Sequence, residues 1–176
     1  MRLGRFDLHL VSDGTFRLDG GAYMTLSPVV LSRGGLHAAG PYSCPNVMVR
    51  ARAAATSTSP HGAFRGFGAP QTVFAMERHL DEVAKRLGIL PEELRRKNLV
   101  RDGETLSTTQ VVRDHVDLRA LLDRAMSLSR YTDRRSEHAA YNAEQERTGG
   151  HKRRGIGLAS FMHGAGFTGS GERMLS

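Results

Sequence analysis

Ten residues near the middle of the chain combine the side chains that a binding loop needs. The stretch Gly62–Gln71 reads Gly-Ala-Phe-Arg-Gly-Phe-Gly-Ala-Pro-Gln, which places two aromatic rings, a guanidinium and an amide among glycines. Glycine adopts backbone conformations that other residues avoid, so this loop can bring Arg65 and Phe67 close to a bound group. Pro70 suits the first turn of a following helix. The cap of that helix, Gly68 or Ala69, has no side-chain oxygen, so we expect its first amides to be open to an anion or a polar cofactor.

The residue types alone leave other interpretations of this loop open. A tight turn that only starts a helix explains the glycines equally well. An isolated phenylalanine is most often part of a core, and an isolated arginine is most often on the surface. A dinucleotide-binding fingerprint is excluded, because the third glycine is missing at the required spacing and no strand of the required type precedes the loop.

The composition indicates a globular protein without a membrane segment. With 176 residues and 39% hydrophobic content, the chain can bury one ordinary core or parts of two. No apolar run approaches the roughly 18 residues that span a bilayer, and the first residues lack a signal-peptide pattern. We therefore expect a cytoplasmic protein with no membrane partner.

Cysteine and histidine usage limits the metal chemistry of the chain itself. Cys44 is the single cysteine, so an internal disulfide or a multi-thiolate zinc or iron–sulfur site is excluded, and any such cluster must be on a partner. A lone cysteine between Ser43 and Pro45 is most often an inert small residue, and we expect Cys44 to be inert. The following histidines show no metal-ligand spacing and are expected to be hydrogen-bonded or exposed: His37, His61, His79 and His163.

The chain is strongly basic, with a net charge of +7 and a pI near 10.3. Several basic residues lie close together in its second half: Arg130, Arg134, Arg135, Arg147, Lys152, Arg153 and Arg154. Such a balance first suggests nucleic acid. However, aromatic residues are only 6%, tryptophan is absent, and no nucleic-acid-binding motif is present. A solvated helix face or a subunit contact is favoured, and no nucleic-acid partner is expected.

The pattern along the chain predicts strands, then helices, then a new extended region. Residues 6–11 alternate and precede a turn, which predicts a hairpin, and residues 47–55 predict a strand. Residues 20–40 are interrupted by glycines, and we assign no helix to them. Pro70–Leu87 is the clearest helix, with one broad apolar face that includes Val73, Phe74 and Leu87.

Four further segments complete this pattern. They are a short helix from Leu90, a helix capped by Asp117 that runs to Met126, a helix capped by Thr132 or Asp133 that runs to Arg147, and an extended stretch after Arg154. No further strands follow to pair with the final stretch, so we expect the chain to be truncated within a sheet. We expect the helix from Val73 to expose its apolar face without that sheet, and the solubility to be poor.

The loop and three other segments resemble one family. Ala63–Gln71 is similar to the cofactor and substrate loop in the molybdenum-binding subunit of xanthine dehydrogenases and aldehyde oxidases, the molybdenum hydroxylases. At matching separations, Leu31–His37, the pair at residues 45–46 and Gly164–Thr168 are similar as well. The resemblance runs along essentially the whole chain but covers only a middle portion of that large subunit.

This resemblance implies an α+β fold that spans two molybdopterin-binding domains. Residues 1–105 would form the C-terminal part of the first domain, and residues 106–176 the N-terminal part of the second. The junction is expected near residues 101–116.

The resemblance also implies three kinds of site residue. The residues around the molybdenum and its pterin are Ala63, Phe64, Arg65 and Gly66. The substrate-binding residues are Phe67, Phe167 and Thr168. The one catalytic residue is Arg33, which matches an arginine that stabilises negative charge on a purine oxygen in xanthine-specific members. The pterin holds the molybdenum, so no protein ligand to the metal is implied.

The chemistry of these side chains suits those roles. Two phenylalanines from distant segments can clamp a flat heterocycle, since aromatic pairing contributes about 0.5–1.5 kcal/mol beyond area burial. An arginine near a purine oxygen would favour a negatively charged transition state over the ground state. The resemblance implies hydroxylation of a purine-like N-heterocycle or an aldehyde with oxygen from water.

The partners implied are iron–sulfur and FAD subunits or domains that accept the electrons, together with a second copy of the assembly as a dimer.

The family's general-base glutamate and a further cofactor loop match no segment of this chain, and Glu172 does not replace the base. We therefore expect no turnover from the chain alone. The alternative is a non-catalytic basic binding module or an inactive gene fragment.

Overall fold

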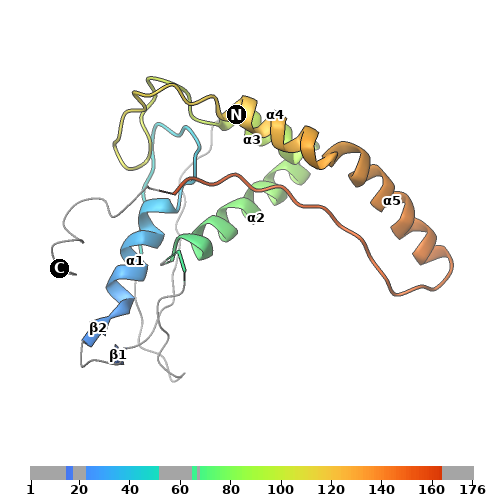
Figure 1. Cartoon of the computed structure of the whole chain (residues 1–176), viewed down its shortest axis with the longest axis horizontal. Helices are drawn as coiled ribbons and strands as arrows, with labels where there is room; N and C mark the ends of the chain where they lie inside the picture. The colour runs from blue at the N-terminus through green and yellow to red at the C-terminus, as the bar shows by residue number, and fades with distance from the viewer. Residues whose placement is uncertain (1–14, 18–22, 52–64, 67, 164–176) are drawn as a thin grey trace.

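The computed structural model describes residues 15–17, 23–51, 65, 66 and 68–163. In this part of the chain, two short strands precede a series of helices, and an extended segment runs back from the last helix (Figure 1). The strands β1 (Thr15–Arg17) and β2 (Tyr23–Thr25) pair antiparallel. The helices are α1 (Leu26–His37), α2 (Ala69–Leu87), α3 (Pro91–Asn98), α4 (Leu118–Ser129) and α5 (Tyr131–Arg147).

The mixed α+β class is not confirmed, because the described residues are mostly helical. The glycine-interrupted segment, where no helix is expected from the sequence, contains α1, although Gly34 and Gly35 weaken a helix. Packing of α1 against α2 outweighs that weakness. The strand predicted at 47–55 is wrong for residues 47–51, which form no strand, and its other residues lie outside the described part. The first segment of the predicted hairpin, residues 6–11, also lies outside it, and the extended segment expected after the turn contains β1, which pairs with β2.

Helix α2 confirms the helix predicted from Pro70 to Leu87. Gly68 and Gly88 flank it in left-handed conformations, with φ of 93° and 65°. Its buried apolar face is narrower than predicted, because Phe74 is 68% exposed. The core around α2 consists of Tyr42, Met76, Leu80, Ala84, Leu94, Leu99 and Leu122.

That core corrects, for most of the helix, our expectation that α2 would expose its apolar face, although Phe74 and Leu87 stay exposed. Side chains from α3, from α4 and from the loop after α1 cover the face within this chain. Backbone bonds fix the loop after α1: the amide of Ser43 donates to Asn98 over 2.8 Å, and the amide of Val100 donates to Pro41 over 3.0 Å. An exposed face of α2 is therefore no longer a reason to expect poor solubility.

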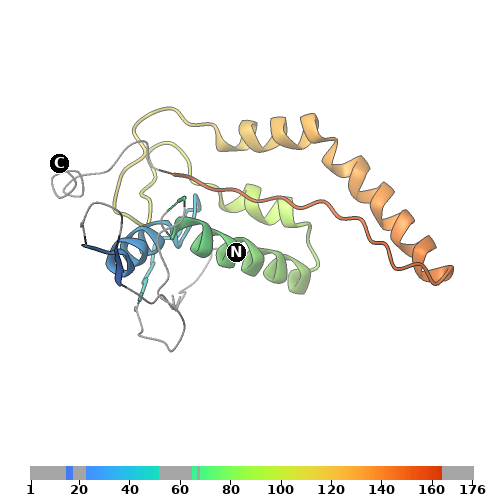
Figure 2. The same cartoon turned by 60° about the horizontal axis from the view of Figure 1, so that its bottom comes forward.

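The later helices agree with their sequence signals except at two ends: α4 runs to Ser129, beyond the predicted Met126, and α5 begins earlier than predicted. Asp117 caps α4 as predicted, because its Oδ1 accepts a bond of 2.9 Å from the amide of Ala120. Helix α5 begins at Tyr131, so the caps predicted at Thr132 or Asp133 are wrong. Arg130 adopts a left-handed conformation with φ of 49° and joins the two helices, which follow one another in Figure 2.

The extended segment at residues 151–163 returns from α5 past α2 to the end of α1 (Figures 1 and 2). At its start, Asn142 of α5 exchanges two bonds of 2.8 Å with the backbone of Arg154. Half-buried and exposed residues then alternate, and the half-buried ones are Ile156, Leu158, Ser160 and Met162. This alternation confirms the extended conformation, although residues 151–163 form no strand pair.

Candidate functional site

The described part of the loop forms a glycine-dependent turn that is fixed to α1. Gly66 and Gly68 have φ of 95° and 93°, backbone conformations that residues other than glycine rarely adopt. A Cβ on Gly68 would lie 2.2 Å from the carbonyl oxygen of Val30 in α1, and a Cβ on Gly66 would lie 2.5 Å from Cγ of Pro70. The backbone of the turn therefore touches both α1 and the start of α2.

The hydrogen-bond donors of this turn suit a polar or anionic cofactor. Arg65 is exposed, and the first turn of α2 contains no acidic residue that would repel an anion. One prediction is wrong, however: the amide of Ala69 is not open, because it donates to the carbonyl of Gly66 over 3.0 Å. Within the described residues, no cluster of histidine, cysteine and acidic side chains could hold a metal ion. A metal held through an organic cofactor needs no such cluster.

Arg33 lies on α1, one helical turn before His37. Nδ1 of His37 donates to the carbonyl oxygen of Arg33 over 2.7 Å. The ring of His37 also stacks on that of His163, with 5.1 Å between the centroids and 24° between the planes. The helix that carries Arg33 therefore meets the extended segment immediately before residue 164.

A buried carboxylate that the sequence analysis did not single out connects these elements. Glu77 of α2 is 5% exposed. Its Oε1 accepts a bond of 2.5 Å from the hydroxyl of Tyr42. Its Oε2 accepts one of 2.8 Å from Nε of Arg95 and one of 2.9 Å from the amide of Ser160. One side chain thus joins α2, α3, the loop after α1 and the extended segment.

Arg95 is completely buried and has further partners. Its guanidinium donates to the carbonyls of Glu77 and Pro91 over 3.1 and 3.2 Å, and it pairs with Asp81 at 2.9 Å. Burial is the largest single effect and opposes its charge, but Glu77, Tyr42 and Asp81 together raise the pKa of Arg95. Burial, and then Glu77, raises the pKa of Tyr42 as well. We call Tyr42, Glu77 and Arg95 the buried triad.

The sequence contained a signal for this triad. Glu77 lies between Met76 and Leu80 on the apolar face of α2, where an unpaired carboxylate would be costly. A charged residue on such a face requires a buried partner. The identity of that partner depends on the tertiary arrangement.

The structure locates only some of the predicted site residues. Arg65, Gly66 and Arg33 are placed: Arg33 lies on α1, and Arg65 and Gly66 form the turn before Gly68, which lies against α1. The remaining predicted residues lie outside the described part: Ala63, Phe64, Phe67, Phe167 and Thr168. The shared aromatic clamp therefore stays a prediction. Cys44 is half-buried, and its Sγ donates to the carbonyl of Asn46 over 3.3 Å.

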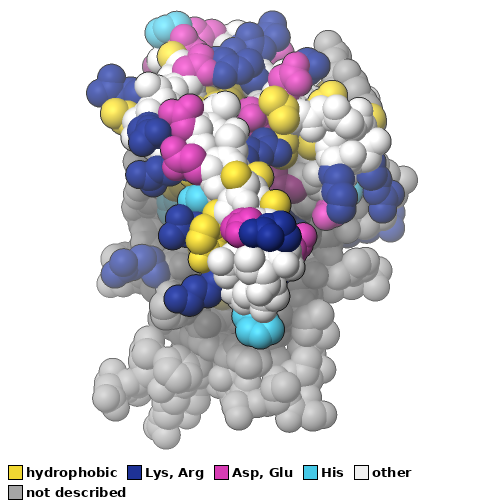
Figure 3. Space-filling view, turned by 90° about the vertical axis from the view of Figure 1, so that its right-hand side faces the viewer, with side chains coloured by type: hydrophobic (Ala, Val, Ile, Leu, Met, Phe, Trp, Pro, Cys, Tyr) yellow, Lys and Arg dark blue, Asp and Glu magenta, His cyan; other side chains and the backbone are white. Residues whose placement is uncertain are grey.

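The basic residues of the second half are interspersed with acidic ones. Arg147 pairs with Glu144 at 2.6 Å and Arg135 with Glu92 at 3.2 Å. Figure 3 shows this end of the molecule, where basic and acidic side chains alternate over the surface. This mixture supports the interpretation as a solvated helix face, because a nucleic-acid surface would carry mainly positive charge.

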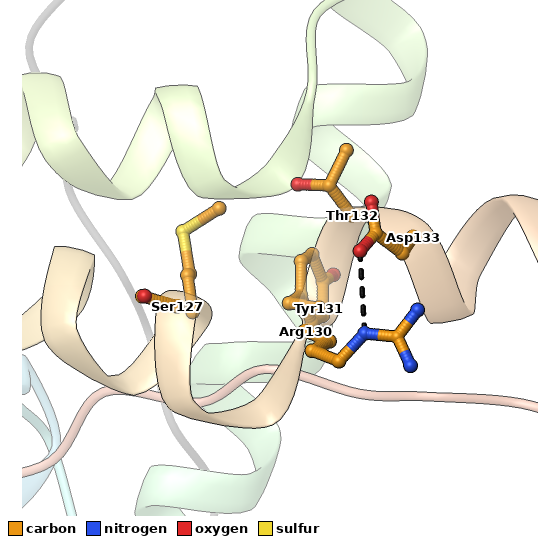
Figure 4. A pocket seen from close by; sticks show the side chains of 6 residues that line it. Ser127, Arg130, Tyr131, Thr132 and Asp133 are labelled. Carbon is orange, nitrogen blue, oxygen red and sulfur yellow. Dashed lines mark hydrogen bonds and ion pairs between the residues drawn. The ribbon is translucent and has the colours of Figure 1, made fainter.

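A shallow pocket at the joint of α4 and α5 is separate from the predicted site residues (Figure 4). Its lining includes Met126, Ser127, Arg130, Tyr131, Thr132 and Asp133. In Figure 4, Nε of Arg130 pairs with Asp133, at 3.3 Å. The pocket contains none of the predicted site residues, and we assign it no role in the site.

The predicted junction at residues 101–116 is a loop between α3 and α4. Asp102 holds its ends together, because it contacts Nδ1 of His115 at 2.6 Å and accepts a bond of 3.1 Å from the amide of Val116. The His115 contact lowers the pKa of Asp102, and the Asp102 contact raises the pKa of His115.

Comparison with known proteins identifies the family. The sequence model of the family described as "Molybdopterin cofactor-binding domain" matches residues 10–99. A protein from Bacillus subtilis, described as a probable subunit of xanthine dehydrogenase, is 39% identical over 157 residues, which are 89% of this chain and 20% of that protein. An aldehyde oxidoreductase from Megalodesulfovibrio gigas is 32% identical over 160 residues, 91% of this chain and 17% of that protein.

Among solved structures, quinoline 2-oxidoreductase from Pseudomonas putida 86 is similar, with a TM-score of 0.65 and 26% identity. The similarity covers 81% of this chain and 18% of that one. The chain belongs to the molybdopterin cofactor-binding domain family of xanthine dehydrogenases and aldehyde oxidoreductases. It spans about a fifth of the length of these relatives.

Within the described residues, no helix is both long and apolar enough to cross a membrane.

Proposed function

We propose that this chain supplies part of the cofactor and substrate site of a molybdenum hydroxylase. The reaction is hydroxylation of a purine-like N-heterocycle, or alternatively of an aldehyde, with oxygen from water. The cofactor is the molybdopterin of the family, which supplies the molybdenum centre for the oxidation. The electrons pass to iron–sulfur clusters and FAD on other subunits or domains.

One structural observation carries this proposal. Gly68, directly after the cofactor turn, lies against Val30 of α1, and the extended segment that ends at His163 contacts the same helix at His37. The cofactor loop and the start of the predicted substrate segment are therefore held on one helix. Two segments far apart in the sequence thus contact one helix about two turns apart, at Val30 and His37, which supports a shared site.

Each residue has a proposed role at this site. Arg65 and Gly66, with Ala63 and Phe64, hold the cofactor. Phe67 and Phe167 clamp the substrate ring, and Thr168 contacts it. Arg33 stabilises the negative charge that develops on the substrate.

An N-heterocycle is favoured as substrate over an aldehyde. Two aromatic residues suit a flat ring, and Arg33 suits a ring oxygen that becomes negative. The names of two relatives, a probable xanthine dehydrogenase component and a quinoline oxidoreductase, agree with this choice. The name of the third, an aldehyde oxidoreductase, supports the alternative.

The division at residues 1–105 and 106–176 remains our proposal for the domains. The family match at residues 10–99 lies within the first of them and supports it. A cytoplasmic location, partner subunits and a dimeric assembly also remain proposals.

The Arg33→Ala variant tests the substrate assignment in the assembled enzyme. We expect kcat for a purine to fall by roughly 100-fold, because a donor to a developing charge is lost, while aldehyde turnover changes only a few-fold. Steady-state kinetics with both substrates measures the difference. The exposed Arg50→Ala variant is the control and should leave both rates unchanged. Equal losses with purine and aldehyde would refute the role of Arg33 and the purine assignment.

A further inference from the structure

The extended segment at residues 151–163 is held by side chains and not by a strand partner. Asn142 fixes its start at Arg154, and Leu158 packs against the core. Glu77 holds the amide of Ser160, and His37 stacks on His163. Of these contacts, the bond to Glu77 is the backbone anchor nearest to residue 164.

The Glu77 carboxylate is well placed to bind the backbone of the extended segment. The other two members of the buried triad are fixed independently of it: Tyr42 lies in a loop paired with residues 98–100, and Arg95 contacts Pro91 and Asp81. Their bonds to Glu77 orient its carboxylate. The carboxylate is therefore preorganised before it accepts the amide of Ser160.

This contact also selects one register of the segment. Residues 156, 158, 160 and 162 face inward, and their neighbours are exposed. A shift by one residue would move Leu158 to the outside, because successive side chains of an extended chain point to opposite sides. It would also present a different amide to Glu77.

We propose that Glu77 is a positioning residue for the substrate site. Its carboxylate fixes the register of residues 154–163 on α2 through the amide of Ser160, and this register determines where the following residues enter the site. The consequence for substrate rests on the proposed function, because it requires that residues 164–168 contact the substrate. The register itself does not depend on that function.

Hydrogen exchange tests the register without reference to activity. In the assembled protein, the amide of Ser160 should exchange far more slowly than those of Ala159 and Phe161. In Glu77→Leu the Ser160 amide should lose this protection, because the leucine side chain has no acceptor oxygen. Tyr42→Phe removes a different bond to Glu77 and should keep the protection. Fast exchange of Ser160 in the unmodified protein would overturn the proposal.

Kinetics of three single substitutions tests the consequence, even if Glu77→Leu fails to fold because Arg95 loses its partner. Ser160→Pro removes the donor amide and the hydroxyl and also fixes φ, while it substitutes no member of the buried triad. We expect it to raise KM for an N-heterocycle by roughly tenfold or more, with kcat changed less and molybdenum content unchanged. Ser160→Ala keeps the amide and Ala159→Pro places a proline at an exposed neighbour, and both should stay within about twofold of the unmodified enzyme.

The outcomes separate this proposal from the proposed function. If the unmodified assembly carries no molybdenum, the proposed function fails, and the exchange of the Ser160 amide still decides the register. If Ser160→Pro is indistinguishable from Ser160→Ala in an active enzyme, the positioning role is refuted. If Ser160→Pro loses its molybdenum, the segment supports the cofactor and not the substrate, which also refutes the proposal.

Discussion

Replacing Arg95 with methionine is expected to destabilise the fold by about 3–5 kcal/mol, the cost of leaving a buried charge without its partner. Arg95 is completely buried, and its removal leaves the Glu77 carboxylate, 5% exposed, without its cation. It also removes the donors to the carbonyls of Glu77 and Pro91. Urea unfolding followed by circular dichroism measures the free energy of unfolding.

The neighbouring residue provides the control for this experiment. Arg96 pairs with Asp123 on the surface, where both side chains are more than one third exposed. Solvent screens such pairs, so Arg96→Met is expected to cost less than about 1 kcal/mol. If the two substitutions had equal effects, the triad would not be the main polar connection between α2 and α3.

Replacing Gly68 with alanine is expected to cost about 2–4 kcal/mol and to displace the cofactor loop. The left-handed backbone at Gly68 disfavours any Cβ, and this Cβ would lie 2.2 Å from the carbonyl oxygen of Val30. That oxygen belongs to the backbone of α1, so the overlap is relieved only by moving the turn away from the helix. Thermal unfolding measures the loss of stability, and cofactor content measures the displacement.

Gly88 is a matched control at the other end of α2. Its φ of 65° is also left-handed, but a Cβ there would meet nothing within 4 Å. Gly88→Ala should therefore cost only about 1–2 kcal/mol of conformational strain and leave cofactor binding unchanged. An effect of Gly68→Ala no larger than that of Gly88→Ala would contradict the close approach of the turn to α1.

Elements with strong local signals could be predicted from the sequence. Helix α2 has a proline in its first turn, a periodic apolar face and a terminal glycine, and helix α4 has Asp117 as its cap. Each of these signals acts within one or two turns of the chain. Helix α1 has Pro28 in its first turn but contains paired glycines and no clear periodic apolar face, and its packing against α2 compensates. That packing is a tertiary effect, which local patterns do not contain.

The same distinction applies to the site. A carboxylate at position 77 on an apolar face indicated a buried partner, but its partners lie 18, 35 and 83 residues away along the chain, at Arg95, Tyr42 and Ser160. Only the folded arrangement brings them together. The roles of Arg65 and Phe67 rest on the family resemblance, because an arginine and a phenylalanine in a glycine-rich turn are compatible with several ligands.

The molybdenum and pterin content of the assembled protein, purified from a host that makes the cofactor, tests the proposed function most directly. We expect molybdenum and pterin in equal amounts, close to one of each per copy of this chain, since the family binds the metal through its pterin. A protein purified under these conditions with neither molybdenum nor pterin would contradict the proposed function and favour a non-catalytic binding module.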